Sequence, residues 1–358
     1  MNLGNLLFRA TGAVARLPEP VGRGLFAAVG TVAGTLPLRG TQQLRRNLTR
    51  VRPDARGRAA RRLTRAAMRS YMRYYYEALR LGTWEADDFA ARVIEDGLDS
   101  ARAEFARGHA LIGALMHMGN WDMAGAWSRY FLAPVHTLVE KLEPAEVFER
   151  FVRLRENIGM VIYPVVKGGG AIHRLAEDTR QGPILAPVLA DRDLTASGVE
   201  VEFFGEKMLA AAGPAILAID TGCAVVPIFS YYVKKERTRA LPTRWRMVLR
   251  SGAPIRARVD AAASPRERHA DIARITQEWI TAFEEVLAEH PEDWHMLQPV
   301  FVADLDRERY RTNREKAARE LARRQAEYDA KEGTPGTSGL PAPIRGTCPG
   351  EWDSISGI

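Results

Sequence analysis

The chain has few cysteines, and they stand where a disulfide is not expected. Among its 358 residues only Cys223 and Cys348 are cysteines. Cys223 lies in an apolar run, whereas Cys348 lies in a terminal stretch rich in Gly, Pro, Ser and Thr. Two residues so far apart and in such different surroundings are poor partners for a structural disulfide, so the composition fits a reducing compartment.

Long apolar runs are absent as well. No uninterrupted run approaches the ~20 residues that a membrane-spanning helix needs. Near the N-terminus Arg9 and Arg16 interrupt the apolar residues, and no signal-peptide core with a cleavage site follows. The sequence therefore predicts a cytosolic protein and leaves peripheral attachment to a membrane open.

Several signatures of nucleotide, metal and esterase sites are missing. The triplet Gly168-Gly-Gly170 matches neither a P-loop nor a dinucleotide fingerprint. No Gly-x-Ser-x-Gly elbow marks a serine hydrolase. The histidines are spread over separate predicted elements without the spacing of metal ligands. We expect neither a metal ion nor a bound cofactor.

Positive charge is plentiful, and it is least opposed by acidic residues near the N-terminus. The formal net charge is +7, and arginines are dense from Arg39 to Arg80, where only Asp54 and Glu77 oppose them. Residues 1–38 carry apolar side chains at helical spacing, as amphipathic helices do. Neighbouring basic and amphipathic helices favour docking on anionic lipid head groups. Nucleic acid is the rival partner, but no nucleic-acid-binding fold signature accompanies the arginines. The remaining alternative is a solvated helical face packed on the protein's own core.

The middle of the chain alternates short apolar runs with helical patterns. Strands are expected over residues 110–116, 135–139, 161–165, 183–189, 199–204, 225–233 and 244–250. Such alternation predicts an α/β fold with a central, mostly parallel β-sheet flanked by helices. We expect three segments: a helical membrane-docking region over 1–83, an α/β core over 84–305, and a charged helix with a disordered tail over 306–358.

One stretch has the pattern of a catalytic turn. The apolar run from Ala110 to Met116 ends at His117, a break follows at Gly119-Asn120, and a helical pattern starts near Asp122. Sites in open α/β folds gather where strands end. Histidine is a general base near neutral pH when a carboxylate holds its ring, and His-x4-Asp supplies such a pair locally. A core histidine beside a helix-capping aspartate is the alternative.

His117-Met-Gly-Asn-Trp-Asp122, taken with later blocks, resembles the bacterial glycerolipid and lipid A acyltransferase superfamily. The later blocks are Arg155-Glu-Asn-Ile-Gly159, the stretch from Asp191 to Gly205, and the stretch from Ala212 to Pro227. Their order and spacing agree with the superfamily over about residues 40–305. The ending Asp293-Trp-His-Met-Leu-Gln-Pro299 and the block at Asp191 look most like the actinobacterial phosphatidylinositol mannoside acyltransferases.

This resemblance implies a peripheral enzyme on the cytoplasmic face of the cell membrane. It would move a fatty acyl group, usually palmitoyl, from acyl-CoA to a mannose hydroxyl of a phosphatidylinositol mannoside. His117 would take the hydroxyl proton and Asp122 would support the imidazolium, so no serine or cysteine nucleophile is needed. The partners implied are acyl-CoA, the glycolipid and an anionic membrane surface, with no nucleic acid.

The resemblance also implies further site residues. Asp191 occupies an active-site acid position at which the mannoside acyltransferases carry glutamate. Substrate-binding positions are implied at Glu140, Arg155, Arg192, Asp193, Ser197 and Asp220. Each has a plainer alternative: a strand-end charge, a helix-surface arginine, a loop ion pair, or an ordinary helix or turn residue. Phe203 and Phe204 are expected to line an acyl tunnel, and Trp294 and His295 to be structural.

Two other classes of function stay open at this level. A hydrolase could use the same histidine and aspartate on water, and a basic protein without enzymatic activity could bind RNA or membrane. Within the transferase class, the acceptor could instead be another glycolipid, such as a lipid A precursor, or a lysophospholipid.

Overall fold

The structure is a computed structural model that describes residues 17–140, 145–165, 170–193, 198–238 and 241–332. Its core is a seven-stranded sheet with the order β1-β9-β8-β2-β5-β3-β4. The strands of this sheet are β1 (Val93–Asp96), β2 (Leu111–Leu115), β3 (Val135–Glu140), β4 (Met160–Val165), β5 (Leu185–Leu189), β8 (Val225–Lys234) and β9 (Trp245–Ser251). All pairings within it are parallel except β8 with β9.

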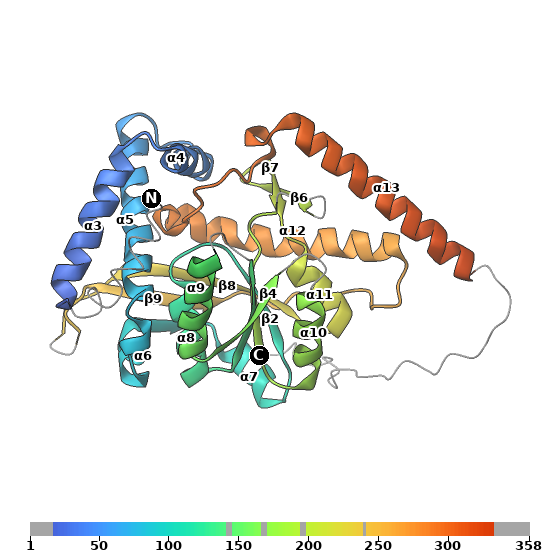
Figure 1. Cartoon of the computed structure of the whole chain (residues 1–358), viewed down its shortest axis with the longest axis horizontal. Helices are drawn as coiled ribbons and strands as arrows, with labels where there is room; N and C mark the ends of the chain where they lie inside the picture. The colour runs from blue at the N-terminus through green and yellow to red at the C-terminus, as the bar shows by residue number, and fades with distance from the viewer. Residues whose placement is uncertain (1–16, 141–144, 166–169, 194–197, 239–240, 333–358) are drawn as a thin grey trace, which may run out of the picture.

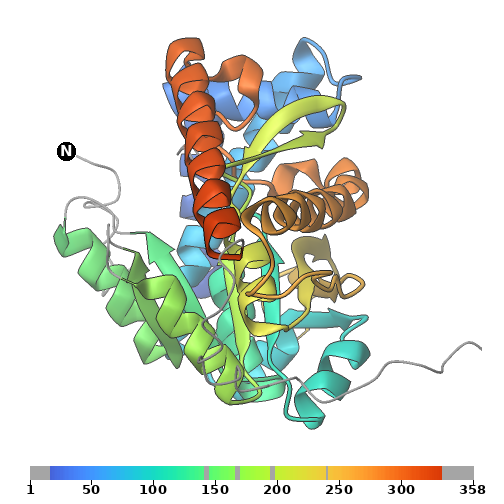
Figure 2. The same ribbon diagram turned by 90° about the vertical axis from the view of Figure 1, so that its right-hand side faces the viewer.

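Helices cover both faces of this sheet, as Figures 1 and 2 show. In chain order they are α3 (Glu19–Thr35), α4 (Arg39–Val51), α5 (Arg58–Ala78), α6 (Ala86–Arg92), α7 (Asp99–Ala106), α8 (Trp121–Phe131), α9 (Ala145–Asn157), α10 (Ala171–Gln181), α11 (Gly213–Thr221), α12 (Pro265–Glu289) and α13 (Arg307–Glu332). Short 3₁₀ turns lie at Leu81–Thr83, Pro291–Asp293 and Val302–Asp304. The predicted class, a mostly parallel sheet flanked by helices, is confirmed.

The alternation of side chains in the strands divides the core into two layers. In β2, Ile112 and Ala114 pack with α11 and α12, whereas Leu111 packs on the opposite face with residues of α8. A strand whose two faces are both covered is apolar throughout, which is why β2 reads as an unbroken apolar run. All five residues of β2 are buried.

Each strand expected from the sequence is present, but two strands were not expected. β1 is only four residues long and ends in exposed Glu95 and Asp96, so its pattern is weak. β6 (Val199–Phe203) does not join the central sheet, because it pairs with the unexpected β7 (Glu206–Ala210) in an antiparallel hairpin.

The N-terminal helices form a layer at one end of the molecule (Figure 1). Helix α3 packs closely on α5, because Gly30 and Gly34 of α3 face the α5 backbone and a Cβ atom there would lie 2.6 to 2.8 Å from it. Among the described residues no single helix is long and apolar enough to cross a bilayer; the pair α3 and α4, bent by 83°, meets that test only jointly and by length and composition. The helix expected before Pro18 lies outside the described residues.

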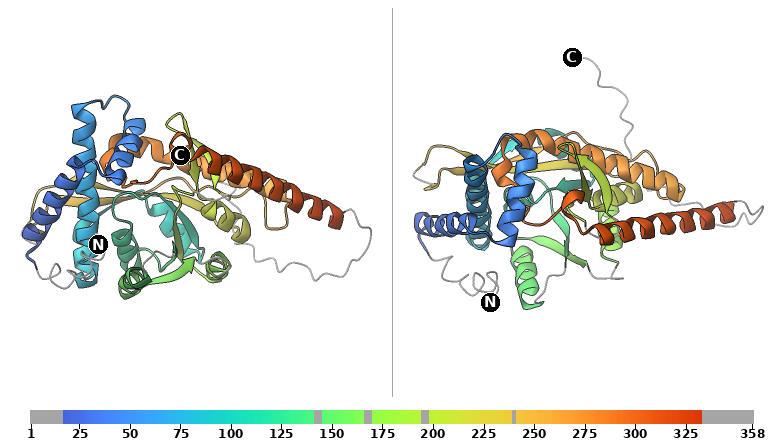
Figure 3. Two further views of the ribbon diagram at one scale, coloured as in Figure 1. Left: turned by 45° about the horizontal axis from the view of Figure 1, so that its top comes forward. Right: turned by 90° about the horizontal axis from the view of Figure 1, so that it is seen from above.

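At the other end of the chain, α13 extends away from the body (Figure 3). Its side chains are mostly exposed and form ion pairs one turn apart, such as Arg323 with Glu327 and Arg324 with Glu320. This agrees with the charged helix predicted from residue 306 onward. The tail predicted to be disordered, which includes Cys348, lies outside the described residues, and the division into three segments stays a prediction.

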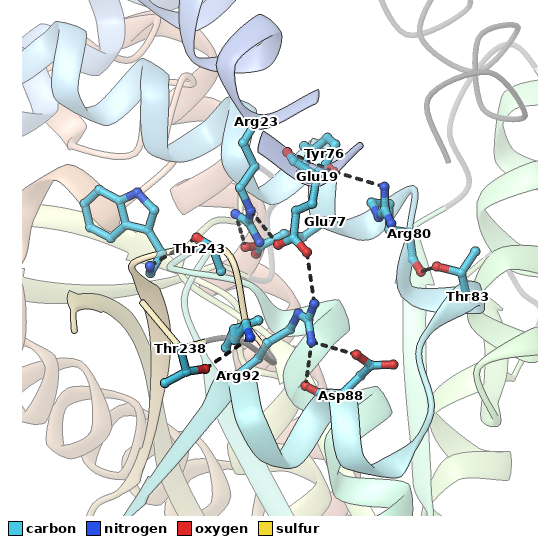
Figure 4. A network of polar contacts seen from close by, with 12 residues as sticks. Glu19, Arg23, Tyr76, Glu77, Arg80, Thr83, Asp88, Arg92, Thr238 and Thr243 are labelled. Atoms are coloured by element: carbon cyan, nitrogen blue, oxygen red, sulfur yellow. Dashed lines mark hydrogen bonds and ion pairs between the residues drawn. The ribbon is translucent and has the colours of Figure 1, made fainter. Parts of the chain in front are cut away.

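A buried network of charges ties α3 to the centre of the fold (Figure 4). Glu77 of α5 accepts hydrogen bonds from Arg23 of α3 at 2.8 Å, from Asn120 at 3.0 Å and from the Tyr232 hydroxyl. The side chain of Asn120 in turn accepts from the Met123 backbone N–H and so caps α8. The first turn of α8 is thereby held by a residue of α5.

Candidate active site

The turn after β2 is held by a segment that follows α12. Gly119 has a φ of +61°, and a Cβ atom there would lie 2.2 Å from the Ser230 carbonyl oxygen, so this position requires glycine. The Gly119 N–H donates to the Asp293 carbonyl at 2.9 Å, and the His295 N–H donates to the His117 carbonyl at 2.7 Å. These bonds on both sides of Met118 fix the backbone that carries His117.

The carboxylate that holds the His117 ring is Asp191, at the end of β5. Nδ1 of His117 lies 2.6 Å from Oδ1 of Asp191, and the His117 backbone N–H donates to Oδ2 at 3.0 Å. The Trp294 indole donates to the same Oδ2 at 2.9 Å. Burial alone would raise the pKa of Asp191, but the charge of His117 and these hydrogen bonds hold that pKa below its ordinary value.

This geometry defines the protonation of the ring. An ionised Asp191 has no proton to give, so Nδ1 of His117 must be the donor in their hydrogen bond. Nε2 then carries the lone pair, and it has no hydrogen-bond partner among the described residues. The His117 side chain is 31% exposed while Asp191 is fully buried. The pair therefore presents a basic nitrogen to whatever enters the site.

In the structure Asp122 contacts Arg155 and Tyr74, and not His117 as predicted. Asp122 lies in the first turn of α8, where Oδ1 accepts from Nε of Arg155 at 2.6 Å and Oδ2 accepts from the Tyr74 hydroxyl at 2.8 Å. Asp191, rather than Asp122, is therefore the carboxylate placed to orient the imidazole of His117. Burial alone would lower the pKa of Arg155, but the charge of Asp122 raises that pKa above its ordinary value.

His117, Asp122 and Arg155 line one large cavity of about 400 Å³. The Trp121 ring meets the His117 ring edge-on at 5.4 Å at the same place. His295 also lines the cavity, but it is buried, and burial lowers its pKa well below the ordinary value. Of the two histidines in this site, His117 is thus the one placed to exchange a proton.

Beyond His117 the cavity wall is mostly apolar and follows one face of α8. Trp121, Gly125, Ser128 and Leu132 recur at intervals of three or four residues along that wall. At a rise of 1.5 Å per residue this is a length of about 16 Å. The opposite wall is formed by side chains of the sheet: Leu111, Leu115, Leu185, Pro187, Val226, Ile228 and Leu249. The apolar lining of this cavity suits a flexible apolar chain.

Glu140 and Arg192 belong to the same cavity and contact each other. Nη2 of Arg192 lies 3.1 Å from Oε2 of Glu140, and Arg192 also donates to the Gln298 side chain. Glu140 is largely exposed, so this pair contributes little to stability and is available to polar ligands. Asp193 follows on the same loop, where its backbone N–H donates to Leu209, and it does not line the cavity.

Asp220 stands apart from this group. It forms an ion pair with Arg268 at 2.6 Å between α11 and α12, on the face of the sheet opposite the cavity. Its implied role in binding the acyl donor is not supported by this placement. Ser197 lies outside the described residues. Phe203 does not line the cavity at His117, because its ring is fully buried and packs against Trp294 and Phe301.

Two residues of the site were not identified from the sequence. Trp294 was expected to be structural, yet its indole is a hydrogen-bond donor to Asp191. Nothing in the sequence singles out Tyr74, yet its hydroxyl donates a hydrogen bond to Asp122. The block at Asp293 to Pro299 was visible as a motif, but nothing in its residue pattern indicates that it packs against the loop at His117. In the part of the chain that the structure describes, no group of three or more His, Cys, Asp or Glu side chains is arranged to hold a metal ion.

The fold and this site define a class: an α/β enzyme that places a histidine–carboxylate pair at an apolar cavity. Comparison with known proteins narrows that class. A family model described as bacterial lipid A biosynthesis acyltransferase matches residues 5–302. The chain belongs to this family and is an acyltransferase.

Two relatives agree on a branch of the family. A protein of Mycolicibacterium smegmatis named phosphatidylinositol mannoside acyltransferase is 35% identical over 298 residues, which are 83% of this chain and 90% of that protein. A protein of the same name from Mycobacterium tuberculosis is 34% identical over 272 residues, 75% of this chain and 80% of that protein. The resemblance seen in the sequence blocks is confirmed.

Proposed function

We propose that this protein transfers a fatty acyl group from acyl-CoA to a mannose hydroxyl of a phosphatidylinositol mannoside. The observation that carries the proposal is the position of His117, whose ring is held by Asp191 at a deep apolar cavity. The names of the relatives supply the acceptor class. Palmitoyl is the chain that we propose on the resemblance, and the apolar lining that follows α8 over about 16 Å is consistent with a long chain.

The reaction needs a base because a sugar hydroxyl is a weak nucleophile. Nε2 of His117 takes the hydroxyl proton while the oxygen attacks the thioester carbonyl. The new ester bond forms as the carbon–sulfur bond breaks, and the proton passes from the imidazolium to the departing thiolate. Asp191 accepts the Nδ1 hydrogen bond throughout and stabilises the imidazolium, as the carboxylate does in a catalytic triad.

Arg155 supplies positive charge beside this reaction. Its guanidinium is held by Asp122 at the cavity, so it can bind a phosphate of CoA or the charge that develops on the thioester. Asp122 is in this proposal a positioning residue that acts through Arg155. Glu140 and Arg192, with their exposed ion pair, are proposed to contact the hydroxyl groups of the acceptor.

We propose that the enzyme works as a peripheral protein on the cytoplasmic face of the membrane. A glycolipid acceptor is anchored in the bilayer, so the cavity must approach a lipid surface. The net charge of +7 and the arginines of α4 and α5 favour an anionic surface.

The test uses purified protein, radiolabelled palmitoyl-CoA and a panel of phosphatidylinositol mannosides. We expect labelled, acylated mannoside from the wild type and none from His117→Ala. His173→Ala is the matched control, because His173 is an exposed histidine on α10 outside the cavity. Labelled free palmitate with every acceptor would instead identify a thioester hydrolase, and label on a different lipid would correct the acceptor. Full activity of His117→Ala would remove the proposed base.

A further inference from the structure

A second cavity lies away from the active site and is lined almost wholly by arginines. Its volume is about 300 Å³, and its lining consists of Gly34 and Thr35 at the end of α3 together with Arg45, Arg58, Arg61, Arg62 and Arg65. It shares no lining residue with the cavity at His117. One water occupies ~30 Å³ in the liquid, so the space admits a phosphate group with several waters.

We call this space the arginine cavity. Its five arginines lack the acidic partners that neighbouring arginines have. Arg50 is paired with Glu206 and Asp304, and Arg52 with Asp54. Within the described residues, no side chain of the five forms a hydrogen bond or ion pair. The Nε atom of Arg45 is buried and has no hydrogen-bond partner there either. A buried donor without an acceptor is costly, so this position favours a ligand that supplies one.

Nothing in the local sequence neutralises this charge. Between Arg39 and Arg80 the only acids are Asp54, which pairs with Arg52, and Glu77, which pairs with Arg23. The first turn of α5 has no acidic residue, and its N-cap, Gly57, provides no side-chain hydrogen bond. The positive end of the α5 helix dipole therefore adds to the potential there.

An apolar stripe runs along the helix whose last turn borders this cavity. Exposed large apolar side chains lie along α3 and just beyond it at Val21, Leu25, Val29, Val32, Leu36 and Leu38. Their helical spacing puts the members within α3 on one face, and Gly34 and Thr35 in the last turn of that helix line the arginine cavity. An apolar stripe contributes nothing to the binding of a soluble anion, whereas a lipid presents phosphate and hydrocarbon side by side.

We propose that the arginine cavity binds the head-group phosphate of an anionic membrane phospholipid while the apolar face of α3 enters the outer part of the acyl layer. Guanidinium groups suit this role because they bind phosphate oxygens in a bidentate fashion. The inference rests on the proposed membrane location and is independent of the proposed acyl transfer. It assigns one lipid-binding site to α3, α4 and α5.

The test measures sedimentation of the full chain with vesicles of phosphatidylcholine alone or of phosphatidylcholine with phosphatidylinositol. We expect binding only to the anionic vesicles. Arg61→Gln with Arg65→Gln should lower the partition coefficient roughly 30-fold, since each basic side chain at an anionic surface contributes a factor of about five. The matched control, Arg307→Gln with Arg311→Gln, removes the same charge from exposed positions on α13 and should bind as the wild type does.

A second pair of variants separates a built phosphate site from a diffuse basic surface. Arg61→Lys with Arg65→Lys keeps the charge and loses the planar fork, so the site predicts weak binding for this variant too. Binding of the lysine variant at wild-type strength would overturn the site. If Arg61→Gln with Arg65→Gln lost binding of CoA in solution but bound anionic vesicles as the wild type does, the cavity would be a site for a soluble phosphate and its assignment to a lipid would be overturned. Failure of the wild type to bind anionic vesicles would remove the membrane location itself, whereas activity on soluble acceptors would be untouched.

Discussion

At the scale of single residues, the carboxylate that holds His117 is not the nearby Asp122 that the sequence suggests but Asp191, which is distant in the chain. Asp122 is five residues from His117, but the turn at Gly119 and the start of α8 direct its carboxylate to Arg155 and Tyr74. Asp191 is 74 residues from His117 and makes two hydrogen bonds to it. The two aspartates therefore have separable roles, which substitutions can distinguish.

Asp191→Asn should reduce kcat roughly 10³-fold or more, with little change in the KM for acyl-CoA. An asparagine amide can leave the ring in the wrong tautomer and cannot stabilise the imidazolium, as in catalytic triads. Asp122→Asn should instead weaken acyl-CoA binding, because Arg155 loses its buried counter-charge. Steady-state kinetics with varied acyl-CoA would check both. A reversed pattern, with turnover lost in Asp122→Asn alone, would return Asp122 to the role first expected from the sequence.

Trp294 offers a second residue-scale prediction. Trp294→Phe removes the indole hydrogen bond to Asp191 and keeps an aromatic ring, so kcat should fall roughly tenfold while both KM values hold. Loss of that donor raises the pKa of Asp191, so the acid limb of the kcat/KM profile should move to higher pH. Trp279→Phe is the control, because Trp279 is equally buried and its indole nitrogen has no partner among the described residues. An identical pH profile in Trp294→Phe and the wild type would show that Trp294 only fills space.

At the scale of elements, α8 connects the reaction to the apolar cavity. Its first turn holds Asp122, capped by Asn120, and its later turns form the cavity wall. Gly125 lies midway along that wall, and a Cβ atom there would approach the Cε of Met160 to 2.2 Å. The absence of a side chain at Gly125 therefore keeps the cavity open at its middle.

Gly125→Leu should shorten the acyl chain that the enzyme accepts. The new side chain and the displaced end of Met160 would fill the cavity beyond the first turn of α8. Long acyl chains would then no longer fit, whereas short acyl chains still would. The ratio of kcat/KM for palmitoyl-CoA to that for octanoyl-CoA should fall by roughly tenfold or more, since each lost buried methylene is worth about 0.8 kcal/mol. The ratio is its own control for folding and enzyme concentration. An unchanged ratio would mean that the acyl chain does not occupy this cavity.

At the scale of the whole molecule, the segment after α12 ties the layers together. Asp293 accepts from the Tyr232 N–H of β8 at 2.7 Å and from the Ser70 hydroxyl of α5, while its own carbonyl holds Gly119. The side chain is buried, and burial raises the pKa of Asp293 to about 6 in spite of Arg73 nearby. Stability should therefore depend on pH through this residue.

The direction of that dependence follows from the raised pKa. Between its ordinary value near 3.8 and about 6, Asp293 binds more protons in the folded than in the unfolded state, so its contribution to stability falls as pH rises. Urea unfolding of the wild type and of Asp293→Asn would be compared from pH 4 to pH 7. The free energy of unfolding of the wild type relative to the variant should fall by about 2 kcal/mol over that range, at about 1.4 kcal/mol per tenfold change in proton affinity. Parallel curves would contradict the assignment.

The sequence by itself determined the class of fold, the strand after which the site begins, and the acyltransferase family. These follow from local information: the period of apolar residues, the break at Gly119, and the ordered blocks around His117 and Asp191. Only the tertiary structure decided which carboxylate holds His117, that Trp294 orients that carboxylate from 103 residues away, and that Asp220 lies on the other face of the sheet. The reason is physical. Residue spacing along a helix or strand predicts neighbours within one element, whereas a parallel sheet brings together strand ends that are far apart in the chain, and the order of its strands is not written in any one segment.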